Sequence, residues 1–222
     1  MGRSLLFGCL LLAGNCLAQG PNQIDFRGTM LVHVEKKIST AWSLTGMAAG
    51  TLTYDFQELG FAWADLGAKY RINRHFGVNL NYRPLLSRNL RNFYRLRQIL
   101  YADLDFSWSR RRWSYGGTAR IQQSGFTDFF EAGRSASWYS RNKFNIRYKA
   151  DYYWQPFVEA ELFVPIHHPS RKRPDQWRLA IGVNYTINRY IRVELSEQIQ
   201  QQINRAPQNT NYLTALNWYI RF

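Results

Sequence analysis

Charged residues recur at every second position in several segments, and they are the residues through which this chain could do chemistry. In one such segment Arg95 and Arg97 are followed, in the same parity, by Asp103 and Asp105. Side chains two residues apart lie on the same face of a β-strand. The spacing therefore predicts rows of bases and acids that can pair with one another or attract an ion.

Catalytic chemistry has less support. The histidines are His33, His75, His167 and His168, and none is placed with a serine in a recognisable motif. The adjacent pair in the second half is a weak signal for a metal, because metal ligands are usually spaced apart. We expect no enzymatic activity, no metal and no cofactor, and we keep an outer-membrane lipid hydrolase as the enzymatic alternative.

The N-terminus predicts a secretory signal peptide over residues 1–18. Arg3 supplies the positive charge, an apolar run follows, and small residues precede a cleavage site after Ala18. Asn15 before Cys16 argues against a lipoprotein signal. Cleavage would remove Cys9 and Cys16, so the mature chain would carry no thiol.

The rest of the chain alternates between apolar and polar residues, which is typical of β-strands. Strands in soluble sheets are about 5–6 residues long, whereas a tilted strand needs about 9–11 to cross a bilayer. Many of these segments reach the longer range. The expected strands are 29–37, 41–51, 60–72, 75–85, 93–109, 112–123, 139–150, 155–165, 176–187, 190–203 and 211–222.

Connections between these strands alternate between short and long. Short turns are expected at 37–40, 73–74, 110–112, 151–154 and 188–189, and longer ones at 52–60, 86–92, 124–138, 166–175 and 204–210. Outer-membrane barrels show this rhythm of tight periplasmic turns and long extracellular loops. We therefore predict an all-β fold, a single antiparallel up-and-down transmembrane β-barrel over residues 29–222, preceded by a short segment over 19–28.

The number of strands is harder to predict. About eleven segments can be counted, whereas two periplasmic termini require an even number. The prediction is a barrel of 10–12 strands, with 12 favoured.

Two distant stretches repeat one phrase, "YRINRHFGVNL" from Tyr70 and "YTINRYIRVEL" from Tyr185. Each reads as a strand, a tight Asn-Arg turn and a second strand, because Asn tolerates left-handed backbone geometry. We predict two periplasmic hairpins, with Tyr70, Tyr185 and Phe76 in an aromatic girdle at the membrane boundary.

The last strand ends on an aromatic residue. Leu216, Trp218, Ile220 and Phe222 lie on one face of it, in the spacing of an outer-membrane assembly signal. We expect the barrel assembly machinery of the outer membrane to be a partner.

Four stretches in this order resemble an uncharacterised family of bacterial outer-membrane β-barrels known only as a domain of unknown function. They are "VEKKISTAWSL", "ELGFAWADLGAKYRINRHFGV", "RQILYADLDFSW" and "RNKFNIRYKADYYWQPFVEAEL". The resemblance implies a location in the bacterial outer membrane and no established activity.

If the apolar parity faces lipid, the polar parity lines the lumen. The expected lumen charge network consists of Arg95, Arg97, Asp103, Asp105, Arg120, Arg141, Lys143, Arg147, Glu159, Glu161, Arg178, Arg192 and Glu194. In one reading the ion pairs fill the lumen and the protein has a structural or surface-interaction role. In the other, surplus bases leave a small anion-favouring pore. A soluble periplasmic lipid-binding barrel, with its faces reversed, is a third alternative.

The net charge of +14 and pI of about 10.1 bear on partners. Nucleic acid is the usual partner of so basic a chain, but export and the spread of bases over many strands argue against it, so no nucleic-acid partner is expected. Arg171, Lys172 and Arg173, in an expected extracellular loop, could contact lipopolysaccharide phosphates or serve only solubility. Outer-membrane lipids and lipopolysaccharide are the expected surroundings, and the oligomeric state stays open.

Overall fold

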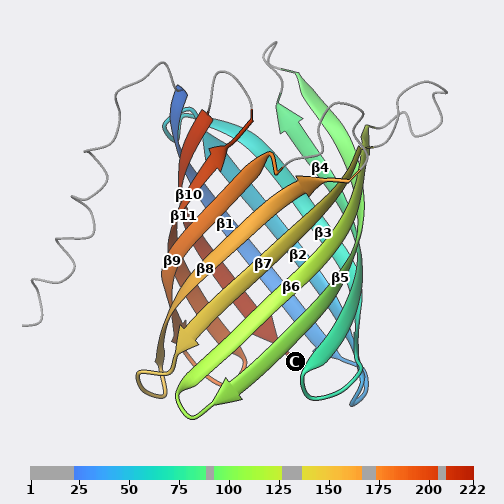
Figure 1. The fold of residues 1–222 in the computed structure, drawn as a ribbon, viewed down its shortest axis with the longest axis vertical. Coiled ribbons are helices and arrows are strands. Elements are labelled where there is room, and N and C mark those ends of the chain that lie inside the picture. Colours follow the sequence, from blue (N-terminus) through green and yellow to red (C-terminus); the bar gives the residue numbers. More distant parts are fainter. Residues whose placement is uncertain (1–22, 89–92, 127–136, 167–173, 205–208) are drawn as a thin grey trace, which may run out of the picture.

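The structure is a computed structural model that describes residues 23–88, 93–126, 137–166, 174–204 and 209–222. These residues form an all-β closed barrel of eleven long, tilted strands (Figure 1). No helix in the described part of the chain is long and apolar enough to span a membrane. The strands are β1 (Gln23–Lys37), β2 (Trp42–Thr53), β3 (Glu58–Arg71), β4 (Phe76–Arg88), β5 (Tyr94–Arg110), β6 (Trp113–Phe126), β7 (Ser137–Tyr148), β8 (Trp154–Pro165), β9 (Gln176–Thr186), β10 (Ile191–Gln202) and β11 (Asn209–Arg221).

The barrel closes through a parallel pair. Strands adjacent in the chain pair antiparallel, but β1 and β11 run in the same direction, with Thr29 opposite Ala215 and Val32 opposite Trp218. An odd number of strands closes only through one parallel pair. The strand count is therefore 11 and not the favoured 12, because the residues before 29 extend the first strand back to Gln23 instead of forming another.

The two parities of each strand face opposite sides of the wall. Leu66, Leu80 and Ile181 are 70%, 59% and 52% exposed on the outside, whereas Asp65 and Asn184 are 1% and 0% exposed on the lumen side. The period-2 pattern produces this result because successive side chains of a strand point to opposite faces. The apolar parity thus forms the outer wall, and the polar parity lines the lumen.

The turns at one end of the barrel share one design. Asn73 accepts hydrogen bonds from the backbone N–H groups of His75 and Phe76, both at 2.8 Å. Asn188, in the second copy of the repeated phrase, accepts the same bonds from Tyr190 and Ile191 at 2.8 and 2.9 Å. The sequence echo is therefore a repeated turn in which an Asn side chain replaces a backbone acceptor.

The same end carries rings on the outer wall. Tyr70 packs against Trp42 with ring centroids 4.8 Å apart, and Tyr185 packs against Trp154 at 4.7 Å. Trp113 and Tyr148 form a third pair at 4.8 Å. The opposite end carries the connections at 89–93, 127–136, 166–175 and 203–208, together with the Tyr54–Gln57 turn, which is shorter than the loop expected over 52–60. We call the two ends the short-turn end and the long-loop end.

Candidate functional site in the barrel lumen

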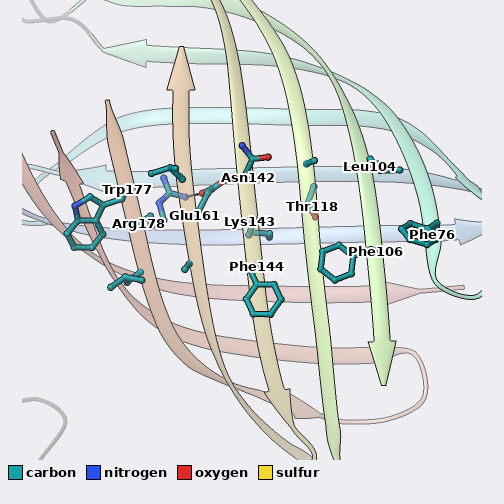
Figure 2. A pocket seen from close by; sticks show the side chains of 14 residues that line it. Phe76, Leu104, Phe106, Thr118, Asn142, Lys143, Phe144, Glu161, Trp177 and Arg178 are labelled. Atoms are coloured by element: carbon teal, nitrogen blue, oxygen red, sulfur yellow. Dashed lines mark ion pairs between the residues drawn. The ribbon is translucent and has the colours of Figure 1, made fainter. Parts of the chain in front are cut away.

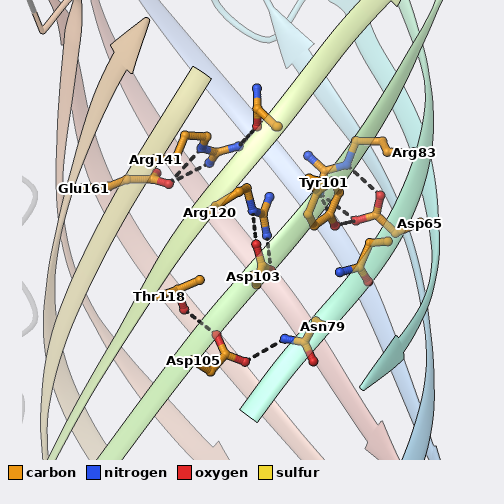
Figure 3. A network of polar contacts seen from close by, with 12 residues as sticks. Asp65, Asn79, Arg83, Tyr101, Asp103, Asp105, Thr118, Arg120, Arg141 and Glu161 are labelled. Carbon is orange, nitrogen blue, oxygen red and sulfur yellow. Dashed lines mark hydrogen bonds and ion pairs between the residues drawn. The ribbon is translucent and has the colours of Figure 1, made fainter. Parts of the chain in front are cut away.

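Asp65, near the middle of β3, is the most enclosed carboxylate of the lumen. Arg83 on β4 binds it with two hydrogen bonds, from Nε at 2.7 Å and from Nη2 at 2.6 Å. The hydroxyl of Tyr101 on β5 donates to the same carboxylate at 2.6 Å (Figure 3). Asp65 is thus held by three donors from two neighbouring strands, the arrangement that a buried charge requires.

Asp103 and Arg120 face each other directly across β5 and β6. Arg120 Nε and Nη2 donate to the two carboxylate oxygens at 2.7 and 2.9 Å, a bidentate pair with both side chains largely buried. Asp105, two residues further along β5, accepts from Asn79 at 2.7 Å and Thr118 at 2.8 Å (Figure 3).

Glu161 on β8 forms ion pairs with bases on both of its neighbouring strands. Arg141 on β7 lies 2.8 Å from one carboxylate oxygen, and Arg178 on β9 lies 3.3 Å from the other. Arg178 also donates to Gln200 on β10 at 2.8 Å. A weaker pair joins Lys143 and Glu159 at 3.4 Å. The ion pairs of the lumen thus involve strands from β3 to β9, and a hydrogen bond to Gln200 extends the contacts to β10.

Aromatic rings lie between these arginines. Tyr101 has the Arg120 guanidinium carbon 3.8 Å from its ring centroid, and Trp63 has that of Arg83 at 4.0 Å. The guanidinium carbon of Arg141 lies 4.5 Å from the ring centroid of Phe163. Guanidinium groups stack favourably on ring faces, which separates the like charges of neighbouring arginines and fills the space between them.

Other members of the expected network are arranged differently. Glu194 accepts from Asn217 at 2.9 Å and Tyr219 at 3.3 Å, both on β11. Arg95 is exposed near the start of β5. Arg97 lies on the same face of β5, opposite Leu85 on β4. Asp103 pairs instead with Arg120, and Lys69 approaches Asp105 at 3.7 Å.

Arg147 on β7 and Arg192 on β10 stand apart from these pairs. Among the described residues, neither makes a hydrogen bond or ion pair to another side chain, and the Nε of each is buried without a partner. Arg192 lies over the ring of Tyr219 at 4.3 Å. The lumen therefore contains two guanidinium groups that form no ion pair with a described carboxylate, although Glu194 lies close enough to attract Arg192.

The C-terminal strand forms half of the closing seam. Leu216, Trp218 and Ile220 face outward opposite Met30, Val32 and Val34 of β1. The backbone of Phe222 continues the ladder, since its N–H donates to the Glu35 backbone carbonyl at 2.9 Å and its own carbonyl accepts from the Lys37 backbone N–H at 3.0 Å. Its ring is 65% exposed and makes no part of that ladder.

A large hollow lies mainly on the outer wall of the barrel. It has a volume of about 620 Å³ and is lined mainly by outward-facing residues of β4 to β9, among them Phe76, Phe106, Phe144 and Trp177 (Figure 2). Phe106 and Phe144 stack across it with centroids 6.4 Å apart. Its charged lining residues are Lys143, Glu161 and Arg178, which belong to the lumen parity and already form ion pairs there. The rest of the lining is mostly apolar, so the lumen is the candidate site.

The remaining candidates lie outside the described residues or away from the ion pairs described above. Arg171, Lys172, Arg173, His167 and His168 lie outside the described residues, as does the expected signal peptide. His33 packs its ring against Tyr219 at 5.6 Å, and His75 lies in a turn, where Nδ1 contacts the Ser107 carbonyl at 2.9 Å. No group of three or more His, Cys, Asp or Glu in the described residues could hold a metal.

The cluster of Asp65, Arg83 and Tyr101 was not singled out from the sequence as a site. Parity places Tyr101 on the same face as Asp103, so its inward direction was readable. Its partner was not, because Asp65 lies 36 residues earlier in the chain.

The comparisons with known proteins agree with the fold. A solved structure described as the NanC porin superposes with a TM-score of 0.50 at 10% identity, over 79% of this chain and 86% of the other. No curated protein matches the sequence. A family model described as "Protein of unknown function (DUF2490)" matches residues 30–211. The chain therefore belongs to the DUF2490 family.

Proposed function

We propose that this chain is an exported outer-membrane β-barrel whose lumen is braced by ion pairs, with a structural or surface-interaction role and no catalytic one. The observation that carries the proposal is the chain of arginine–carboxylate pairs near mid-strand. Asp65, Asp103 and Glu161 are each less than a tenth exposed, and each is bound by an arginine. Side chains fill the interior of small barrels, and long paired arginines suit that task.

The outer wall supports the location. Leu44, Leu66, Leu80, Val158 and Ile181 are all more than half exposed, so the wall is apolar where a soluble barrel would be polar. Bands of outward rings at the short-turn end match the aromatic girdle of outer-membrane barrels. These features also disfavour the soluble lipid-binding barrel, whose apolar side chains would face inward.

Fractionation tests the location. We expect the mature protein in the outer-membrane fraction, extracted only by detergent. Folded protein recovered from the periplasm without detergent would contradict a location in the outer membrane. Protease added to intact cells then gives the orientation, with cleavage expected in the connections of the long-loop end.

An anion-favouring pore is the second candidate, and the unpaired Arg147 and Arg192 favour it. Conductance in planar bilayers separates the two. A braced lumen gives no channel steps, whereas a pore gives steps with anion selectivity that fall when these arginines are replaced by Gln.

A further inference from the structure

The short-turn end of the lumen is strongly basic. Every short connection is described, and the bases exposed in them or at the adjoining strand ends are Lys36, Lys37, Arg71, Arg74, Arg110, Arg111, Arg112, Lys149, Arg189 and Arg221. Asp151 is the only acidic side chain in these connections, and it already accepts the N–H groups of Tyr153 and Trp154 at 2.7 and 2.6 Å. Glu35, near the end of β1, pairs with Arg221 at 2.9 Å, which leaves a large excess of bases. A mouth with an excess of one sign of charge concentrates ions of the opposite sign.

Arg147 and Arg192 lie just inside this mouth. Arg147 is near the end of β7 and Arg192 is the second residue of β10, both on the lumen side and partly exposed. Their charges are close enough to interact, and Tyr219 lies near both. Glu194 attracts Arg192 without forming an ion pair with it, and Arg147 adds a second cation. This excess of partly desolvated positive charge is unfavourable unless an anion joins it.

A buried amide lies on a strand between them. Asn184 on β9 is fully buried, and neither its Nδ2 nor its Oδ1 has a partner among the described residues. It sits opposite Glu194 on β10 and Gln155 on β8. An unbonded buried amide costs about 1–3 kcal/mol, so its presence beside two unpaired arginines points to a further polar group at this place.

We propose that the short-turn half of the lumen is a binding site for an oxyanion, a carboxylate or phosphate group of a small soluble solute. Arg147 and Arg192 supply charge-assisted hydrogen bonds to its oxygens, and Asn184 supplies a neutral donor. The site rests on the proposed function only in needing a lumen that water can enter from the short-turn end. It can exist as a closed vestibule below the braced middle or as one station of a pore.

Calorimetric titration of the full mature barrel in a neutral detergent tests the site. Inorganic phosphate and gluconate are the two probes, at constant ionic strength set with chloride. We expect Arg147→Gln and Arg192→Gln each to weaken binding about tenfold or more, the effect of one lost charge-assisted bond. The matched control is Arg74→Gln, an exposed turn arginine at the same mouth, which should keep the affinity within about twofold.

A further variant guards against misfolding. Asn184→Asp places a carboxylate near the two arginines and opposite Glu194, so it should abolish phosphate binding, and cooperative thermal unfolding of each variant verifies that the barrel is folded. Equal binding by the wild type and all variants, or no binding by the wild type, would overturn the site. So would a loss in Arg74→Gln as large as in Arg147→Gln, because this would reveal a diffuse surface effect. Conductance is a separate readout, so a non-conducting barrel that binds phosphate keeps the site and excludes the pore.

Discussion

Arg120 and Arg141 occupy directly opposite positions on β6 and β7, yet their guanidinium groups turn away from each other. Arg120 pairs with Asp103 on β5 at 2.7 Å, and Arg141 pairs with Glu161 on β8 at 2.8 Å. Like charges directly opposite in a sheet are destabilising. The two flanking carboxylates are therefore what makes this cross-strand pair of arginines tolerable, and they join four strands.

Removing one of these carboxylates should weaken the barrel strongly. Asp103→Asn leaves Arg120 buried and unneutralised opposite Arg141, so we expect a loss of about 3–5 kcal/mol in the free energy of unfolding. Urea unfolding from lipid vesicles measures it. The double variant Asp103→Asn with Arg120→Gln should recover much of the loss. Additive losses in the double variant would mean that the pair is not coupled.

Glu197 provides a test of which face is in lipid. It faces outward on β10, between Ile181 and Thr214, and within the described residues its hydrogen-bond donor is the Thr214 hydroxyl, at 2.9 Å. A carboxylate toward lipid is unfavourable, so Glu197→Leu should raise the free energy of unfolding in vesicles by about 1 kcal/mol.

The same strand contains the control for that substitution. Glu194 faces the lumen and accepts two hydrogen bonds, so Glu194→Leu should lower the free energy of unfolding. If Glu194→Leu stabilised and Glu197→Leu destabilised the barrel, the assignment of inside and outside would be wrong.

The repeated turn predicts paired effects at two distant positions. Asn73→Ala and Asn188→Ala each remove a side chain that accepts two backbone N–H groups, so each should lower the free energy of unfolding by about 1 kcal/mol. Asn188→Asp keeps the acceptor and should behave like the wild type. Arg189→Lys, at the next position, keeps the cation next to the Tyr190 ring and serves as the control, and a larger loss there than at Asn188 would contradict this account of the turn.

Phe222 allows assembly to be separated from stability. Its backbone closes the seam with Glu35 and Lys37, whereas its ring is exposed. Phe222→Ala should leave the free energy of unfolding in vesicles nearly unchanged but reduce the amount of assembled protein in cells. The reason is that only the assembly machinery would recognise the ring. Folded barrel in the outer membrane, quantified by its resistance to unfolding in cold SDS, measures the effect. Normal assembly of the variant would exclude a role for the ring.

Much of this barrel was readable from the sequence because one physical rule governs it. Successive side chains of a strand point to opposite faces, so parity placed the apolar residues such as Leu66 and the charged residues such as Asp103 on opposite sides of the wall. Which side is the outer one was predicted from strand length and the rhythm of the connections. Turn chemistry is equally local, and the Asn in each copy of the repeated phrase identified the hairpins. These features depend on residues within a few positions of one another.

The tertiary structure decided which strands meet and which charges pair. The parallel contact of β1 with β11 joins Thr29 to Ala215, and no local pattern encodes the direction in which a barrel closes. Arg141 could have reached several acids by parity, but strand register and side-chain length bring it to Glu161 and leave Arg147 without a described partner. Pairing across strands depends on the registers of the neighbouring strands together, so it exists only once the sheet has closed.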